Sequence, residues 1–331
     1  MQIVAGGGGF IGVNLVKRLL DKGIQVAVLD NFSMQSKEDF LSFLGTKEVF
    51  IIDVDLSDQD ATMEAFQTCI SHLGVVDAIW HLAANSDIPA GVNDSAVDVR
   101  HTFMTTVVLC EMAKQFEIKN FYFSSSSAVY GDWGDTALEE KLGPLTPISN
   151  YGAMKLASEA QICAASQAYL HDVCIFRFPN VIGVPATHGV IFDFVNKLKV
   201  NKTLLEVLGD GSQKKSYLHV SELVDAMLYI VEKMQLSSAH RSPLIINIGN
   251  ADDGVSVRDI AEFVVSVCEP NAAIQFGPGK IGWLGDVPKF KYITKKLNDL
   301  GWYPELSSKA AMQKAVLEIE GQFKQGARSS A

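Results

Sequence analysis

Short apolar runs alternate with segments of helical periodicity through the first half of the chain. The segments between the runs repeat apolar residues at the spacing of one helix face, as in Val107–Phe116 and Met154–Tyr169. Strands that are apolar on both faces and separated by helices are typical of a parallel sheet covered on both sides. The pattern therefore predicts an α/β fold with a doubly wound parallel sheet. Its predicted strands are Ile3–Ala5, Val26–Leu29, Val49–Ile52, Ala78–Leu82, Phe121–Ser124 and Val173–Phe178.

The alternation breaks up after about Pro179, where Pro and Gly concentrate in three irregular stretches. This change predicts a smaller C-terminal α+β lobe. A helical segment, Ser221–Met234, and an apolar run, Leu244–Ile248, are predicted to return to the main sheet. The expected domains are residues 1–178 with returns near 219–249, a lobe of 179–218 and 250–325, and a flexible tail of 326–331.

Composition narrows the function classes. The chain has 331 residues and is 48% apolar, which is enough to form a core. Its net charge of −10 is unlike that of a nucleic-acid-binding protein. Five widely separated cysteines without a C-x-x-C pair favour reduced thiols over disulfides. The first predicted strand begins at residue 2, and no apolar run approaches the length of a membrane span. We therefore expect a cytoplasmic protein without membrane or nucleic-acid partners.

Three glycines follow the first predicted strand and open a helix. Gly6 permits a tight turn, Gly9 lets the backbone approach a ligand, and Gly12 allows close packing of helix on strand. The N–H groups at the start of such a helix bind a pyrophosphate. A glycine-rich turn without a ligand is the alternative interpretation, and the glycines alone do not exclude it.

Asp30 ends the second predicted strand and favours the ligand-binding interpretation. A carboxylate about twenty residues beyond the glycines accepts both hydroxyls of an adenosine ribose and repels a 2′-phosphate. The following residues, Asn31-Phe32-Ser33, include no Arg or Lys that would attract such a phosphate. Together the glycines and Asp30 predict a Rossmann dinucleotide site that binds NAD rather than NADP.

Tyr151 and Lys155 lie four residues apart, on one face of a predicted helix, and Ser126 follows the fifth predicted strand. An ammonium beside a phenol favours the phenolate and lowers its pKa, and a positive nicotinamide ring adds to this effect. Ser126 could then hydrogen-bond the same substrate oxygen. An exposed Tyr–Lys pair on an ordinary helix is the alternative, which the neighbouring dinucleotide loop disfavours.

These motifs, in this order, resemble the extended short-chain dehydrogenase/reductase family, and in particular its nucleotide-sugar epimerase branch. The resemblance covers residues 1 to about 320. It implies NAD-dependent epimerisation of a nucleotide-diphosphate sugar at C4, of the UDP-glucose/UDP-galactose type, through a 4-keto intermediate. It also implies a homodimer formed through a four-helix bundle. The motifs that carry it include Gly6–Gly12, Leu29–Ser33, Asp55-Leu56, His81–Ala84, Arg177–Asn180, Gly209–Gly211 and Lys215–Val220.

The resemblance assigns the site residues. The implied catalytic residues are Ser126, Tyr151 and Lys155. The implied cofactor-binding residues are Gly6, Gly9, Phe10, Ile11, Gly12, Asp30, Asn31, Ser33, Asp55, Leu56, Leu82, Ala83, Ala84, Ser124, Tyr151 and Lys155. The implied substrate-binding residues are Ser126, Asn180, Lys215, Tyr217 and Phe290.

At several motif positions the chain differs from enzymes of the family that it resembles. Dehydratases of this group carry Asp-Glu where this chain has Ser127-Ala128, and sugar-acid decarboxylases carry a Glu there. Lys215 replaces a more usual Arg, and Trp283 replaces a second pyrophosphate arginine. His101 stands where many members have an Asn. These departures leave the nucleotide and the sugar open.

Two other functions remain open on the sequence. A 4-ketoreductase or sugar dehydrogenase with net hydride transfer would use the same residues and release reduced cofactor. A non-enzymatic protein that senses NAD would bind the cofactor and signal through partner contacts. The seven histidines show no metal-ligand spacing with carboxylates, so we propose no metal.

Overall fold

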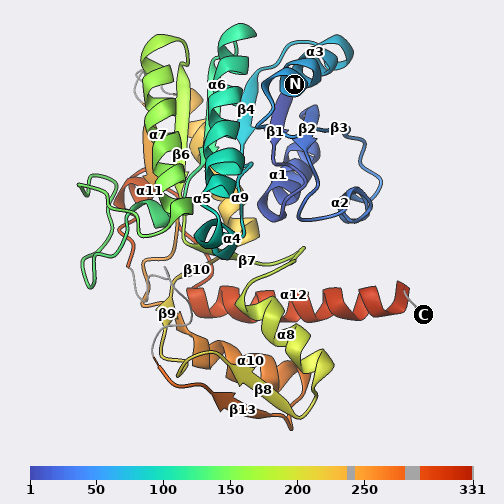
Figure 1. The fold of residues 1–331 in the computed structure, drawn as a ribbon, viewed down its shortest axis with the longest axis vertical. Coiled ribbons are helices and arrows are strands. Elements are labelled where there is room, and N and C mark those ends of the chain that lie inside the picture. The colour runs from blue at the N-terminus through green and yellow to red at the C-terminus, as the bar shows by residue number, and fades with distance from the viewer. Residues whose placement is uncertain (237–242, 280–290, 330–331) are drawn as a thin grey trace. The chain divides into compact units, whose positions relative to one another are not determined.

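The computed structural model describes residues 1–236, 243–279 and 291–329 (Figure 1). The chain divides into two compact units. Unit 1 comprises Met1–Gly131, Glu140–Phe178 and Val224–Asn247. Unit 2 comprises Asp132–Glu139, Pro179–Leu223 and Ile248–Ala331.

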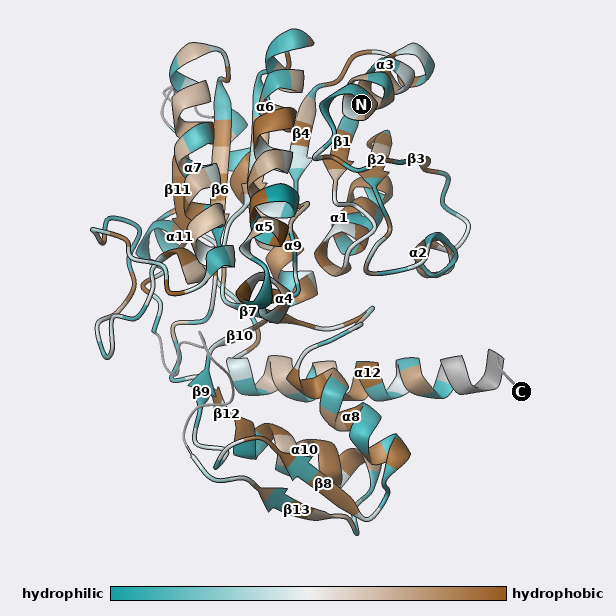
Figure 2. Cartoon of the chain, viewed as in Figure 1, coloured by the Kyte–Doolittle hydropathy of each residue, from teal (hydrophilic) through white to brown (hydrophobic). Residues whose placement is uncertain are grey.

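Unit 1 is built on a parallel sheet, which confirms the predicted fold class. Among the described residues the sheet has seven strands, in the order β11-β6-β5-β4-β1-β2-β3. Its central strands are hydrophobic along most of their length, as Figure 2 shows, and their side chains are buried on both faces. The strands are β1 (Gln2–Ala5), β2 (Val26–Asp30), β3 (Phe50–Asp53), β4 (Ala78–His81), β5 (Asn120–Ser124), β6 (Asp172–Arg177) and β11 (Leu244–Asn247).

Helices connect these strands. The longer ones in unit 1 are α1 (Phe10–Asp21), α2 (Lys37–Leu44), α3 (Gln59–Leu73), α6 (Thr105–Gln115) and α7 (Asn150–Ala168). Three short helical segments follow β4, namely α4 (Ile88–Asn93), α5 (Ser95–Asp98) and a π-helix (Val99–Met104), which runs directly into α6. Helix α9 (Val220–Gln235) begins in unit 2 and continues into unit 1.

Unit 2 combines short strand pairs with helices, as predicted for an α+β lobe. Strand β7 (Asn180–Ile182) pairs with β10 (Tyr217–His219), and β8 (Leu204–Val207) pairs with β13 (Ala273–Phe276), both in parallel. Strand β9 (Lys214–Lys215) pairs with β12 (Val255–Ser256) in the antiparallel sense. Its core lies among α8 (Val190–Val200), α10 (Val257–Cys268) and α12 (Ser308–Ser329), and α11 (Lys295–Asp299) follows the last strand.

The predicted elements agree with the observed ones apart from their ends. The apolar run Leu244–Ile248 returns to the main sheet as β11, as predicted. Helix α7 begins at Asn150, four residues earlier than predicted, because Ser149 caps it by accepting a hydrogen bond from the Gly152 N–H. Helix α12 includes residues 326–329 of the predicted tail, whose flexibility stays a prediction. No helix within the described ranges has the length and apolar character needed to span a bilayer.

Candidate active site

The glycine loop lies between β1 and α1, where the carboxyl end of a parallel strand meets a helix N-terminus. Gly6 has a φ of +79°, and a Cβ there would lie 2.4 Å from the backbone nitrogen of Ala83. A Cβ on Gly12 would lie 2.2 Å from the Gly6 carbonyl oxygen. Gly9 occupies the N-cap of α1 and has no side chain to bond the first-turn N–H groups. The loop therefore leaves those donors to an anion such as a pyrophosphate.

The Asp30 carboxylate faces the same loop. It accepts hydrogen bonds from the backbone N–H groups of Gly8 (2.9 Å) and Phe32 (2.7 Å). Burial raises the pKa of Asp30, and these N–H donors oppose the rise. Two backbone donors thus fix the carboxylate beside the phosphate-binding turn, as the predicted ribose contact requires.

The other predicted cofactor residues also follow strand ends in unit 1. Asp55 and Leu56 come after β3, and Leu82-Ala83-Ala84 come after β4. Arg100, which the sequence analysis missed, donates to Asp55 at 3.2 Å and to the Ser57 hydroxyl at 3.2 Å. Within the sheet unit, the glycine loop, Asp30 and these strand ends have the chemistry that an adenine dinucleotide requires.

Gly9→Ala and Gly12→Ala are expected to differ in their effects. A Cβ on Gly9 meets only an ordinary contact, 3.5 Å from the Gly6 oxygen, so Gly9→Ala should leave protein stability unchanged. Its methyl would project into the phosphate approach and weaken NAD binding by roughly tenfold or more, since overpacking costs about 1–3 kcal/mol. Gly12→Ala should lower both stability and affinity. Calorimetric titration and thermal unfolding test this, with Gly321→Ala as the control. Wild-type NAD affinity in Gly9→Ala would contradict it.

Ser126, Tyr151 and Lys155 are brought together where β5 ends beside α7. Lys155 is 1% exposed and donates from Nζ to the Ser124 carbonyl at 2.6 Å. Its Nζ lies 5.8 Å from the centroid of the Tyr151 ring and 4.6 Å from that of Phe123. Ser126 hydrogen-bonds the Tyr151 side chain, and its Oγ also accepts from the Ala128 N–H at 3.2 Å. The three predicted catalytic side chains thus form one cluster.

Burial is the largest influence on the acid–base balance of this cluster. Burial raises the pKa of Tyr151 to about 12, and the hydrogen bond with Ser126 opposes this rise. Burial lowers the pKa of Lys155 to about 7, while the nearby Glu159 carboxylate raises it. The predicted lowering of the tyrosine pKa depends on Lys155 together with a positive nicotinamide ring, and it stays a prediction. The chain's own groups favour the protonated phenol, and a further positive charge is needed to make it a base.

The buried Lys155 gives a test through protein stability. Its pKa is about 7 in the folded chain and returns to about 10.4 on unfolding, so unfolding takes up a proton between these pH values. The free energy of unfolding of the cofactor-free protein should therefore rise above about pH 7, by about 1.4 kcal/mol per pH unit from this group. Urea denaturation from about pH 6 to 9 should show this rise relative to Lys155→Met. Lys141→Met, at an exposed lysine, is the control. Parallel curves for wild type and Lys155→Met would contradict the expectation.

A buried ion pair lies next to the cluster and was missed by the sequence analysis. Glu159, one helical turn after Lys155, binds Arg177 of β6 through two hydrogen bonds of 2.9 and 2.6 Å. It also accepts from the Ser125 hydroxyl at 2.5 Å. The spacing Tyr151, Lys155, Glu159 places all three on one helix face, which is the signal that could have revealed it.

Of the predicted substrate residues, Ser126 belongs to unit 1, and Asn180, Lys215 and Tyr217 belong to unit 2. Asn180 on β7 stands opposite Tyr217 on β10 in the parallel register. Lys215 lies on β9, opposite Val255. Tyr217 is buried and packs in the hydrophobic core, which favours a supporting role for it. Phe290 and Trp283 lie outside the described residues.

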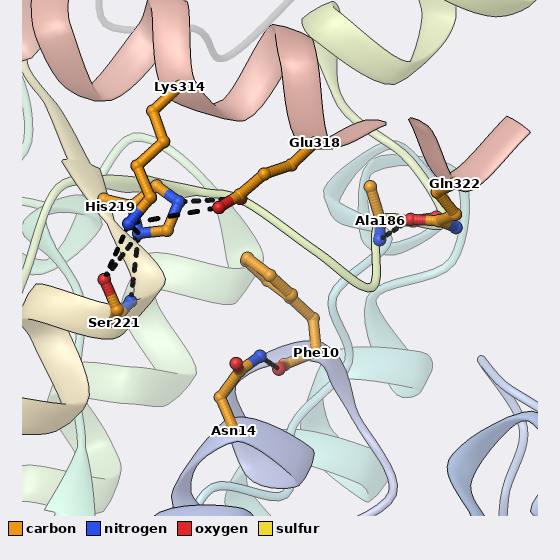
Figure 3. Close-up of polar contacts among 8 residues, drawn as sticks. All are labelled: Phe10, Asn14, Ala186, His219, Ser221, Lys314, Glu318 and Gln322. Atoms are coloured by element: carbon orange, nitrogen blue, oxygen red, sulfur yellow. Dashed lines mark hydrogen bonds and ion pairs between the residues drawn. The ribbon is translucent and has the colours of Figure 1, made fainter. Parts of the chain in front are cut away.

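Two histidines considered in the sequence have defined partners. His81, at the end of β4, is buried, and its Nε2 lies 2.8 Å from the Thr106 hydroxyl. Burial and the Lys155 charge lower the pKa of His81, so it is neutral. In unit 2, His219 contacts Ser221 through Nδ1 at 2.7 Å and Glu318 through Nε2 at 2.9 Å (Figure 3). Among the described side chains, no three His, Cys, Asp or Glu residues gather as metal ligands would.

The chain is similar to known proteins over most of its length. A family model described as the NAD-dependent epimerase/dehydratase family matches residues 2–249. A putative UDP-glucose 4-epimerase of Methanocaldococcus jannaschii is 27% identical over 96% of this chain and 97% of its own.

Solved structures agree over nearly the whole length. A crystal structure of a UDP-galactose 4-epimerase has a TM-score of 0.82 and 32% identity, covering 98% of this chain and 99% of the other. The UDP-glucose 4-epimerase of Thermus thermophilus, solved in complex with NAD, has a TM-score of 0.81 and 26% identity, covering 97% of this chain and 99% of the other.

Proposed function

Because the chain belongs to the NAD-dependent epimerase/dehydratase family, we propose that it inverts C4 of a nucleotide-diphosphate hexose of the UDP-glucose/UDP-galactose type. The observation that carries this proposal is the cluster of Ser126, Tyr151 and Lys155 at the end of β5. The residues that follow Ser126 are Ser127 and Ala128, so the acids that dehydration or decarboxylation needs are not at these positions.

The cofactor is NAD, and the glycine loop and Asp30 would hold it. When bound, NAD would supply a positive charge to the site and the capacity to take up and give back a hydride at C4. This positive charge would lower the pKa of Tyr151 and favour the phenolate. Burial has the opposite effect, because it raises the pKa and keeps Tyr151 protonated. Retention of the cofactor through each cycle is part of this proposal.

The chain's residues move the proton. Tyr151 removes the proton of the 4-hydroxyl as C4 is oxidised, and Ser126 orients the same oxygen through its hydroxyl. The resulting 4-keto sugar turns over and is reduced on its other face, while Tyr151 returns the proton to the oxygen. Lys155, fixed by the Ser124 carbonyl, stabilises the phenolate during the keto stage.

Substrate anchoring is assigned to unit 2. We propose that Asn180 and Lys215 bind the sugar nucleotide, with Lys215 acting on the diphosphate as a point charge. Tyr217 would support Asn180 through the pairing of their strands. Phe290 stays a predicted substrate contact.

A homodimer in the cytoplasm belongs to the same proposal. Support comes from Val99 and Met104, two exposed apolar side chains in the π-helix that leads into α6. The family resemblance implies a dimer formed through a four-helix bundle. Light scattering on the purified protein tests the dimer.

The proposal is tested by incubating purified protein with UDP-glucose or UDP-galactose without added NAD and following the products by NMR. Interconversion of the two sugars is the expected result. Conversion only with added NAD, together with accumulation of NADH, would instead support net hydride transfer. Loss of CO2 from UDP-glucuronic acid would indicate a decarboxylase. No conversion of any of these sugars, with or without NAD, would contradict the proposed substrate class.

A further inference from the structure

Asp98, the last residue of α5, is a buried carboxylate that the proposed mechanism does not use. It is fully buried, and its Oδ1 accepts a hydrogen bond from the Asn85 side-chain amide at 2.9 Å. Its Oδ2 has no hydrogen-bond partner among the residues that the structure describes. Burying a half-satisfied carboxylate costs stability, so its presence calls for an explanation.

The unpartnered oxygen lies against Gly91 of α4. A Cβ on Gly91 would come within 1.8 Å of Oδ2, so only glycine allows this approach. The Gly91 carbonyl in turn accepts from the Asn150 side chain at 2.7 Å, and Asn150 is the residue before Tyr151. Asp98 is thereby connected, through Gly91 and Asn150, to the start of α7.

Asn85 extends the same network toward the cofactor side of unit 1. Its backbone N–H donates to the Thr102 hydroxyl in the π-helix at 3.1 Å, and its side chain donates to the Asp87 carbonyl at 2.9 Å. Asn85 directly follows the predicted cofactor contacts Leu82-Ala83-Ala84. Segments α4, α5 and the π-helix all pack against α7. One carboxylate therefore ties the segment after β4 to the helix that carries Tyr151.

The charged groups around Tyr151 come from two directions. Lys155 faces the ring from α7, and the Glu159 carboxylate raises the pKa of Lys155. The neighbouring His81 is neutral, because burial and the Lys155 charge lower its pKa. Asp98 lies on α5, and its charge raises the pKa of Tyr151. Burial and the neighbouring Asp87 raise the pKa of Asp98 itself, while Asn85 opposes that rise.

We propose that Asp98 is a positioning residue for Tyr151, which fixes the start of α7 through Gly91 and Asn150 and places a negative charge against the phenolate. This inference rests on the proposed role of Tyr151 as the proton acceptor. The negative charge opposes Lys155 and the oxidised cofactor, so that the phenolate remains a strong enough base to remove the proton of an alcohol.

The test is a direct titration of Tyr151 in the NAD-loaded protein. The ultraviolet absorbance of tyrosinate is followed against pH in wild type and in Asp98→Asn, each corrected by its Tyr151→Phe counterpart so that the other tyrosines cancel. In Asp98→Asn the titration midpoint should fall by on the order of one pH unit. Asp87→Asn is the matched control, because Asp87 is exposed and an Asn there can still cap α4; it should shift the midpoint less.

Two outcomes would overturn the inference: a midpoint in Asp98→Asn equal to that of wild type, or one shifted no further than in Asp87→Asn. A role in packing alone would lower stability without moving the midpoint. If Asp98→Asn does not fold, Asp98→Ser removes the same charge, retains an acceptor for Asn85 and has the same expected result. The titration uses no sugar, so failure of the proposed epimerisation and failure of this inference are separate results.

Discussion

Tyr151→Phe should abolish most turnover while leaving NAD bound. The substitution removes only the hydroxyl, so the ring keeps its place beside Lys155 and the fold should be unaffected. Loss of a positioned general acid–base group costs roughly a hundredfold to ten-thousandfold in rate. The rate of sugar interconversion and the NAD content of the purified variant are the two measurements.

The controls separate the enzymatic from the non-enzymatic interpretation. Tyr303→Phe, at an exposed tyrosine, should leave the rate unchanged. Ser126→Ala should lower the rate less than Tyr151→Phe, since Ser126 orients the oxygen but does not carry the proton away. An unaltered cellular function in Tyr151→Phe would favour a protein that senses NAD. Loss of bound NAD in this variant would contradict the assigned role of the hydroxyl.

The sheet and the dinucleotide site could be predicted because their determinants are local. Strands that are buried on both faces are continuous apolar runs in the sequence. The glycine loop and Asp30 lie within about one strand–helix–strand unit. Tyr151 and Lys155 share a helix face through a spacing of four. Each of these patterns lies within a short stretch of chain, where spacing alone fixes the geometry.

The supporting residues could not be predicted because they depend on contacts between distant segments. Asp98 and Glu159 are charged residues within helices, and such residues are usually solvent-exposed. Only the packing of α5 against α4, and of α7 against β6, buries them. The π-helix Val99–Met104 likewise has no recognisable periodicity in the sequence. The extent to which burial raises the tyrosine pKa could not be predicted for the same reason, since the degree of burial is a property of the whole unit.

Removing one partner of the Glu159–Arg177 pair should strongly destabilise unit 1. The side chains of both residues are 4% exposed, and the Arg177 guanidinium lies 4.9 Å from the centre of the Tyr130 ring. Glu159→Gln keeps the volume but leaves the arginine charge buried without a counter-charge. Breaking such a pair by removing one partner costs about 3–5 kcal/mol, so we expect a loss of that size in urea denaturation.

Two further variants test whether the loss of stability in Glu159→Gln comes from the arginine charge that stays buried. Asp299→Asn breaks an exposed ion pair with Lys295 and should cost less than about 1 kcal/mol. Glu159→Leu combined with Arg177→Met removes both charges and should be more stable than Glu159→Gln alone, because no unpaired ion stays buried. If Glu159→Gln were as stable as wild type, the pair would contribute little. Glu159 also raises the pKa of Lys155, so its loss should make that lysine easier to deprotonate and weaken catalysis together with stability.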